Sequence, residues 1–167
     1  VSKEAFNIDG FGKKIVENFW KLNLIRLPQD IFKLDFNAIE NLDGWGKQSV
    51  SNLKYSINIK RTIPFEKFIF ALGIRHIGLE NAKLISKNLF SVKNFLLLSK
   101  TKKFNDLINI DGIGETQINS IRNFFSNNIN LKMLKELNEL VDIKDAVLLK
   151  SNGLFTNKTF MITGKQS

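Results

Sequence analysis

The chain has 167 residues, of which 43% are hydrophobic and 15 are phenylalanine, enough for one packed domain or one domain and a fragment. Its net charge of +9, from 25 basic and 16 acidic side chains, favours a polyanionic partner such as nucleic acid or an anionic membrane surface. The absence of cysteine excludes disulfides and thiolate metal sites, and a single histidine excludes a histidine metal cluster. No apolar run approaches the roughly 20 residues of a membrane span, and the start of the chain lacks the apolar core of a signal peptide. We therefore expect a soluble, cytoplasmic protein with no membrane partner and no metal site.

One short phrase recurs along the chain, and its spacing bears on the architecture. The sequence NIDGFG at residues 7–12 returns as NLDGWG at 41–46 and as NIDGIG at 109–114, and an altered copy, GIRHIG, occupies residues 73–78. The final glycines of the copies lie about 34 residues apart, a period typical of a repeated structural unit.

Apolar residues at helical spacing follow every copy, and similar patterns precede most of them. Ile15, Val16 and Phe19, for example, share one helix face. In chain order, helices are predicted after Gly12, at 31–34 and 36–42, after Gly46, at 65–72, after Gly78, at 92–99 and 104–110, after Gly114, and at 131–140. Pro28 and Pro64 are each expected at the first turn of a helix. The predicted fold class is therefore all-α, with a helix, a tight turn and a helix as its unit.

A helical period of this length also fits tetratricopeptide repeats. Those repeats carry signature aromatic and small residues inside their helices, whereas here the repeated part is the turn itself. We therefore favour an architecture that repeats the turn.

The recurring turn suits the binding of a phosphate group. Its two glycines can take positive φ, which permits a turn too tight for residues with a Cβ atom, and the apolar residue between them can anchor the turn in the core. The second glycine leaves backbone N–H groups bare at a helix start, where unpaired amides and the helix dipole form an anion site. Such a site contacts phosphate without reading base sequence. Basic or polar residues that follow the turns directly are Lys13, Lys14, Lys47, Gln48, Ser49, Thr116 and Gln117.

The altered copy replaces an acid by a base. His76 stands where the other copies have their first glycine, and Arg75 replaces the aspartate. Both side chains are therefore candidates for a phosphate or the DNA minor groove. A lone histidine is also common as a packing or capping residue, and that alternative stays open for His76.

Other interpretations of the turns fit less well. A single copy would be only a sharp connector between packed helices. The phosphate-binding loop of nucleotide-binding proteins needs a glycine where Asn7 and Asn41 stand, and the Rossmann fingerprint lacks its third glycine. Asp9, Asp43 and Asp111 recur at equivalent turn positions, which favours hydrogen bonds within the turn over a metal-dependent nuclease.

The phrases, in this order, resemble the C-terminal half of bacterial NAD-dependent DNA ligases. The most specific part is FALGIRHIG at residues 70–78. The opening VSKEAFNIDGFG is similar to the stretch after that family's four-cysteine zinc finger, and KTFMITGK at 158–165 is similar to the first strand of its BRCT domain. The resemblance covers essentially the whole chain.

The resemblance implies four helix-hairpin-helix motifs in two pseudo-symmetric (HhH)₂ units, which bind the minor-groove side of nicked duplex DNA. It implies a parent enzyme that seals nicks in replication and repair, with NAD, Mg²⁺ and Zn²⁺ bound by regions outside this chain. The adenylation step of such an enzyme needs a lysine in a Lys-x-Asp-Gly motif. In this chain the residues two positions before the Asp-Gly pairs are Asn7, Asn41 and Asn109. We therefore expect this chain to be non-catalytic alone, to bind no cofactor and to be a monomer.

The predicted organisation is a helix-hairpin-helix DNA-binding domain at residues 1–152 and a truncated BRCT start at 153–167. Hairpins are placed near 9–13, 43–47, 74–79 and 111–115. The predicted DNA contacts are Gly10, Gly12, Lys13, Lys14, Gly44, Gly46, Lys47, Gln48, Arg75, His76, Gly78, Gly112, Gly114, Thr116 and Gln117. Two alternatives stay open: a helix-hairpin-helix module of another DNA-repair or recombination protein, and a helical protein-interaction scaffold without a nucleic-acid role.

Overall fold

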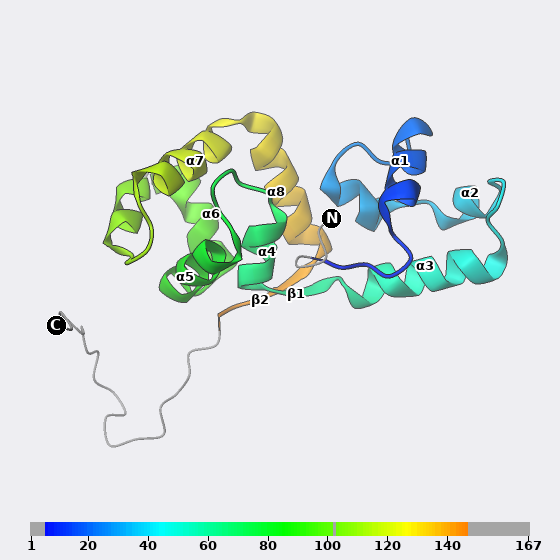
Figure 1. Cartoon of the computed structure of the whole chain (residues 1–167), viewed down its shortest axis with the longest axis horizontal. Coiled ribbons are helices and arrows are strands. Elements are labelled where there is room, and N and C mark those ends of the chain that lie inside the picture. The colour runs from blue at the N-terminus through cyan, green and yellow to red at the C-terminus, as the bar shows by residue number, and fades with distance from the viewer. Residues whose placement is uncertain (1–5, 102, 147–167) are drawn as a thin grey trace, which may run out of the picture.

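A computed structural model describes residues 6–101 and 103–146 of the chain, and nearly all of the regular structure in this part is helical (Figure 1). The α-helices are α1 (Lys13–Lys21), α2 (Phe36–Glu40), α3 (Lys47–Ile59), α4 (Phe65–Ala71), α5 (Leu79–Leu89), α6 (Val92–Thr101), α7 (Glu115–Ser126) and α8 (Asn128–Leu140). Two 3₁₀ helices, η1 (Pro28–Lys33) and η2 (Lys103–Asn109), and two short strands, β1 (Thr62–Pro64) and β2 (Asp142–Lys144), complete it. The all-α fold class is confirmed.

The predicted helices appear with two differences in type. Those expected after Gly12, Gly46, Gly78 and Gly114 begin at the very next residue, as α1, α3, α5 and α7. The segments predicted at 31–34 and 104–110 belong instead to the 3₁₀ helices η1 and η2. Short runs of this tighter helix are common as connectors, and side-chain periodicity over four to seven residues does not separate the two types.

Both prolines lie at helix starts. Pro28 occupies the first position of η1, as predicted, and the carboxylate of Asp30 accepts the backbone N–H groups of Arg26 and Leu27, both at 2.8 Å. Pro64 is the residue that caps α4, and it also ends strand β1.

Strands β1 and β2 pair in parallel, although 77 residues lie between the end of β1 at Pro64 and the start of β2 at Asp142, and neither strand was predicted. The register places Ile63 opposite Ile143, and the Ile63 side chain is 3% exposed. A parallel pair needs a long crossover connection, here supplied by α4 to α8. Three residues are too few for an alternating pattern to be visible in the sequence. The predicted BRCT start at 153–167 lies outside the described residues.

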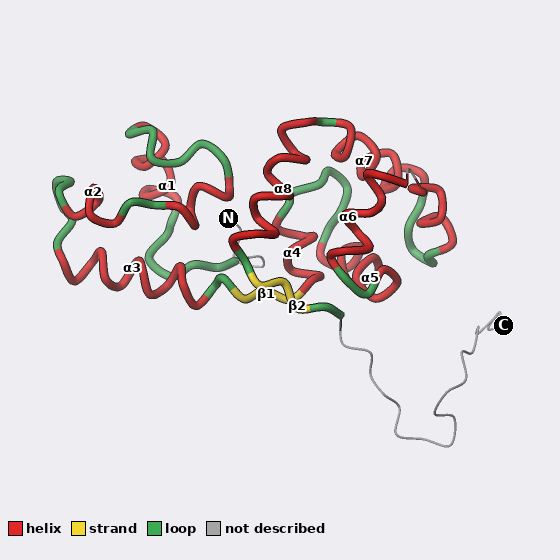
Figure 2. The backbone as a smooth tube through the Cα atoms, turned by 180° about the vertical axis from the view of Figure 1, so that it is seen from behind, coloured by secondary structure: helices red, strands yellow, loops and turns green. Residues whose placement is uncertain are grey.

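The elements form two groups that Figures 1 and 2 show from opposite sides. One group holds α1, η1, α2 and α3, and the other holds α4 to α8 with the strands. Helix α3 leads directly into β1, so the chain crosses between the groups at residues 60 and 61.

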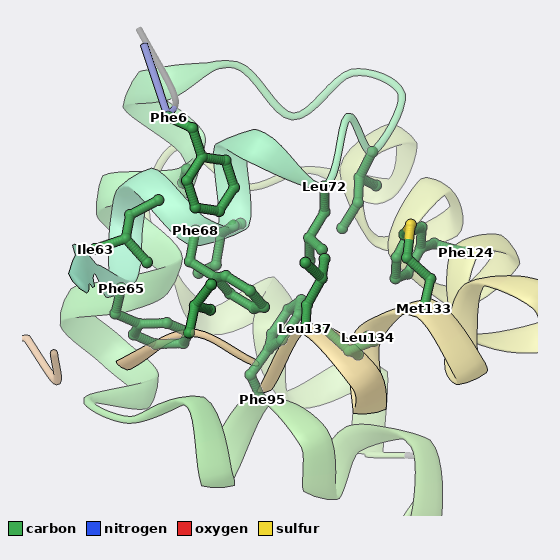
Figure 3. Close-up of a cluster of buried hydrophobic side chains, with 14 of the residues drawn as sticks. Phe6, Ile63, Phe65, Phe68, Leu72, Phe95, Phe124, Met133, Leu134 and Leu137 are labelled. Carbon is green, nitrogen blue, oxygen red and sulfur yellow. The ribbon is translucent and has the colours of Figure 1, made fainter. Parts of the chain in front are cut away.

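The larger group is built around buried phenylalanine rings (Figure 3). Phe65 and Phe68 of α4 and Phe95 of α6 are fully buried beside Leu134 of α8. The Phe95 ring meets those of Phe65 and Phe125 edge-on, at centroid distances of 6.1 and 5.1 Å. Burial of each such side chain contributes about 1.5–3 kcal/mol, so this cluster holds α4, α6, α7 and α8 together.

Candidate nucleic-acid interface

The four recurring phrases form four turns of one geometry. We name them the first (residues 8–12), second (42–46), third (74–78) and fourth (110–114) hairpin. In each, the N–H of the inner apolar residue donates to the carbonyl oxygen three residues earlier. These bonds join Phe11 to Ile8 at 3.1 Å, and Trp45 to Leu42, Ile77 to Ile74 and Ile113 to Ile110 at 3.0 Å each.

The third residue of each turn has the positive φ that a type II turn requires. Gly10, Gly44 and Gly112 have φ of 75°, 80° and 87°, and His76 takes the same conformation with φ of 62°. Histidine is among the few non-glycine residues enriched in this region of backbone space. The altered copy therefore keeps the backbone of the other three.

The second glycine of each turn does not have positive φ, so the expectation of left-handed geometry at both glycines was wrong. Gly12, Gly46, Gly78 and Gly114 have extended backbones, with φ between −77° and −125°, and each is the N-cap of the following helix. Any residue adopts this conformation. Backbone strain therefore does not explain these glycines.

The four helix starts lack a capping side chain. No side chain accepts the first N–H groups of α1, α3, α5 or α7 among the described residues. A Cβ atom at Gly12 or Gly46 would have no neighbour within 4 Å, and at Gly78 only the Asn81 side chain at 3.9 Å. At Gly114 a Cβ atom would meet Gln117 Oε1 at 3.4 Å. The starts of α1, α3 and α5 thus present unpaired amides beside open space, the arrangement that binds anions.

The inner apolar residues point into the core, as predicted. Phe11, Ile77 and Ile113 are buried, and Trp45 is half-buried. Phe11 and Trp45 both pack on Phe19 of α1, with ring centroids 5.8 and 5.5 Å away. The first and second hairpins are therefore held side by side, and we call them the N-terminal pair.

The third and fourth hairpins also lie together, as the C-terminal pair. The Asn81 side chain of α5 donates to the carbonyl oxygen of Gly112 at 3.4 Å. A Cβ atom at Gly112 would come within 2.8 Å of Leu84 Cδ1, so α5 packs directly against the fourth turn. Sequence reasoning missed Asn81. It stands three residues after Gly78, where the second and fourth copies also have a polar residue, so aligning the repeats would have singled it out.

Three predicted polar contacts also have partners within the chain. Gln117 is half-buried, and its carbonyl oxygen accepts the N–H of Gly114 at 3.1 Å. Ser49 accepts the N–H of Gly46 in the same way at 2.9 Å. Gln48 donates to Asn52 Oδ1 at 2.9 Å, one helical turn along the exposed face of α3. Gln117 and Ser49 thus fix the N-cap glycine, a structural role that the sequence interpretation did not include.

The other predicted contact residues are exposed. The structure leaves Gly10, Gly12, Lys13, Lys14, Gly44, Gly46, Lys47, Arg75, His76, Gly78, Gly112, Gly114 and Thr116 at the surface. Asp9, Asp43 and Asp111 are exposed as well, and within the described residues their carboxylates make none of the expected turn hydrogen bonds.

Charge differs between the two pairs. In the N-terminal pair, Lys13, Lys14 and Lys47 occupy the first positions of α1 and α3, and Lys13 forms a long ion pair with Glu17 at 3.8 Å. In the C-terminal pair, α5 and α7 instead have Glu80 and Glu115 in their first turns.

The hydrogen bond and charge of Lys83, 2.6 Å away, lower the pKa of Glu80 and keep it ionised. The first turns of α5 and α7 therefore carry negative charge, and within the turns of the C-terminal pair Arg75 of the third hairpin adds positive charge beside His76.

Neither a metal site nor a membrane span is found in the described part. No three acidic, histidine or cysteine side chains gather closely enough there to hold a metal ion. No described helix is both long and apolar enough to cross a bilayer.

Residues 67–134 match the family model of the helix-hairpin-helix motif. This stretch runs from α4 into α8 and contains the third and fourth hairpins, so a helix-hairpin-helix motif is present in the C-terminal pair. The model covers two of the four turns, and the count of four motifs stays a prediction.

The chain is also similar, over nearly its whole length, to proteins named DNA ligase. It is 63% identical over 165 residues to that of Pelagibacter ubique, 40% over 176 residues to that of Rickettsia canadensis, and 39% over 171 residues to that of Wolbachia pipientis wMel. These matches cover 98–99% of the chain but 24–26% of each relative, so the chain spans about a quarter of their length. The prediction of a helix-hairpin-helix region similar to that of DNA ligases is confirmed.

Proposed function

We propose that the hairpins bind the phosphate backbone of duplex DNA from its minor-groove side, without reading base sequence. The observation that carries this proposal is the set of uncapped helix starts behind Gly12, Gly46, Gly78 and Gly114. Serine, threonine, aspartate or asparagine would stabilise an N-cap better than most residues. Glycine instead leaves the amides open, with room for an oxygen of another molecule at the position of the missing side chain.

The parent protein that we propose is an NAD-dependent DNA ligase, which joins a 5′-phosphate to a 3′-hydroxyl at nicks during replication and repair. The similarity to DNA ligases supports this assignment. NAD, Mg²⁺ and Zn²⁺ would bind to other regions of such an enzyme. Asn7, Asn41 and Asn109 occupy the place of a nucleophilic lysine, so this chain holds DNA and leaves the chemistry to the rest. We expect it to act in the cytoplasm as a monomer.

The mechanism of binding follows from the helix starts. Two to three unpaired N–H groups and the positive end of the helix dipole face each bound phosphate. Lys13, Lys14 and Lys47 add charge beside the first and second hairpins, and Arg75 beside the third. Contacts of this kind release counterions from DNA, so affinity should fall steeply with salt.

The experiment that tests the proposal places a capping side chain at two turns. Gly12→Ser and Gly46→Ser together put hydroxyls at N-cap positions with suitable backbone geometry, so the helices should be as stable as before or slightly more so. The hydroxyls would occupy the amides and the space that a phosphate needs. Fluorescence anisotropy with nicked, intact and single-stranded DNA, across a salt series, should show weaker duplex binding by about tenfold.

A matched control is Asn127→Ser, which exchanges one capping residue for another at the start of α8, outside the hairpins. It should leave affinity unchanged. If the wild-type chain binds duplex DNA and the chain with Gly12→Ser and Gly46→Ser binds it equally well, the helix starts are not part of the interface. No duplex binding by the wild-type chain at low salt would favour a protein-interaction scaffold instead.

A further inference from the structure

We infer that Arg61 and the Lys33–Glu136 ion pair are positioning residues that fix the two hairpin pairs relative to each other, so that both engage one duplex. This inference rests on the proposed function. It concerns the junction between the two groups of helices, outside the turn residues predicted to contact DNA.

Arg61 ties three segments together at the point where the chain crosses between the groups. Its guanidinium donates to the carbonyl oxygen of Phe32 in η1 at 2.6 Å and to that of Leu140 at 3.0 Å. Its Nε donates to Asn58 Oδ1 at 3.2 Å, and its own carbonyl oxygen accepts the N–H of Asp142 at 2.6 Å. Leu140 ends α8, where unpaired carbonyls favour a cation.

The planar fork of arginine suits this task. It donates in several fixed directions at once, which lysine cannot do. The guanidinium also lies over the Phe32 ring, 5.4 Å from its centroid, so the side chain is held from two sides. One side chain thereby fixes η1, from the N-terminal group, to the end of α8, from the C-terminal group.

A second contact joins the same two helices. Lys33 of η1 forms an ion pair with Glu136 of α8, and Lys132 lies 3.9 Å from the other carboxylate oxygen. Gln29, which is 2% exposed in η1, lies close enough to Glu136 to help lower the pKa of that carboxyl. Two separate polar contacts resist rotation of one group against the other better than either alone.

Apolar side chains of both groups also meet at the junction, although a cavity leaves part of it unfilled. A cavity of about 460 Å³ lies between them, lined by Trp20, Ile31 and Phe32 on one side and by Phe70, Met133 and Leu137 on the other. Lining side chains from both groups, such as Phe32 and Leu137, are nevertheless buried in one continuous apolar cluster. The polar contacts therefore act together with this packing to fix how the two groups are oriented.

A fixed orientation matters because two linked sites bind one ligand far more tightly than either does. The gain is typically a hundredfold or more, about 10²–10⁴, and it is lost when geometry prevents both from engaging. The N-terminal pair carries three lysines at its helix starts and the C-terminal pair carries Arg75, so neither pair alone has the whole positive surface.

The orientation can be measured without DNA. The chain has no cysteine, so Ser51→Cys on α3 and Asn123→Cys on α7 accept one spin label each. Both positions are exposed. Pulsed electron resonance should give one narrow distance distribution for the otherwise wild-type chain. Arg61→Gln should broaden it, and the matched control Lys60→Gln, which removes the same charge from the neighbouring residue, should not.

Binding is measured with the same variants and with a charge exchange. Arg61→Gln should weaken duplex binding by about tenfold or more, against less than about threefold for Lys60→Gln. Glu136→Lys replaces a negative by a positive charge, which by charge alone would strengthen DNA binding. The inference predicts the opposite, weaker binding, and predicts that Lys33→Glu combined with Glu136→Lys restores both the narrow distribution and the affinity.

Each outcome decides the matter. Broadening with loss of affinity, and recovery in the exchange variant, supports the inference. An unchanged distance distribution in Arg61→Gln overturns it, whatever the affinity does. Tighter DNA binding by Glu136→Lys also overturns it. If the wild-type chain binds no DNA, the proposed function fails, and the distance distributions still show whether the junction fixes the orientation.

Discussion

Alanine at the first glycine of a turn should cost different amounts in the two hairpin pairs. Gly44 and Gly112 have nearly equal φ, 80° and 87°. An L-residue in this region costs about 1–2 kcal/mol. At Gly44 a Cβ atom would meet nothing within 4 Å, whereas at Gly112 it would lie 2.8 Å from Leu84 Cδ1. Relieving that overlap adds about 1 kcal/mol, the low end of an overpacking cost, because the terminal methyl of a half-buried leucine can move.

We therefore expect Gly44→Ala to lower the free energy of unfolding by about 1–2 kcal/mol and Gly112→Ala by about 2–3 kcal/mol. Urea unfolding followed by circular dichroism measures both, with the slope checked for constancy between variants. Truncating the neighbour, in Gly112→Ala with Leu84→Ala, should abolish the extra cost in a double-mutant cycle. Equal losses at the two glycines would refute the close packing of α5 against the fourth turn.

Three further outcomes are expected. Charge reversal at Lys13, Lys14 and Lys47 should weaken binding to every duplex sequence about equally and flatten the salt dependence, as titrations of unrelated duplexes would show. His76→Gly should raise the free energy of unfolding by up to about 1 kcal/mol, because glycine adopts positive φ without strain. The same variant should weaken DNA binding. Equal affinity would show that the imidazole does not contact DNA. A hydrogen bond from its partner lysine lowers the pKa of Glu136 from its usual 4.5, so this carboxyl contributes stability that is present above pH 4.5 and lost as the pH falls through the lower folded value. When the free energy of unfolding is measured as the pH falls, Glu136→Gln should not show that loss of stability.

Local features of the fold could be predicted from the sequence, because one turn determines where each helix begins. Gly12 and Gly46 precede helices that start at the next residue, and Phe11 is buried as its position between two glycines implied. The conformation of His76 was not predicted. A histidine carries no sign of positive φ in the sequence, and only alignment with Gly10, Gly44 and Gly112 suggests it.

Features that depend on distant residues could not be predicted. Strands β1 and β2 exist because α8 returns the chain to the end of α3, and nothing within three residues encodes that return. Nothing in the sequence distinguishes Arg61 and Glu136 from ordinary surface charges. Their roles depend on distant partners: Arg61 donates to the carbonyl oxygen of Leu140, 79 residues away, and Glu136 pairs with Lys33, 103 residues away. Gln117 was predicted to face DNA, and its contact with Gly114 becomes visible only once the helix start is known.

The two glycines of each turn serve different purposes, and the altered third copy separates them. The first position requires positive φ, a demand of the fold, and there the chain tolerates a substitution, His76, at modest strain. The second position makes no conformational demand, and at Gly12 and Gly46 a side chain would have open space, yet all four copies keep glycine. A residue that the fold does not need, retained at every repeat beside unpaired amides, is most simply explained by a ligand that approaches the backbone there. Stability and DNA binding should therefore respond to different glycines: alanine at Gly44 should lower stability more than affinity, and serine at Gly46 should do the reverse.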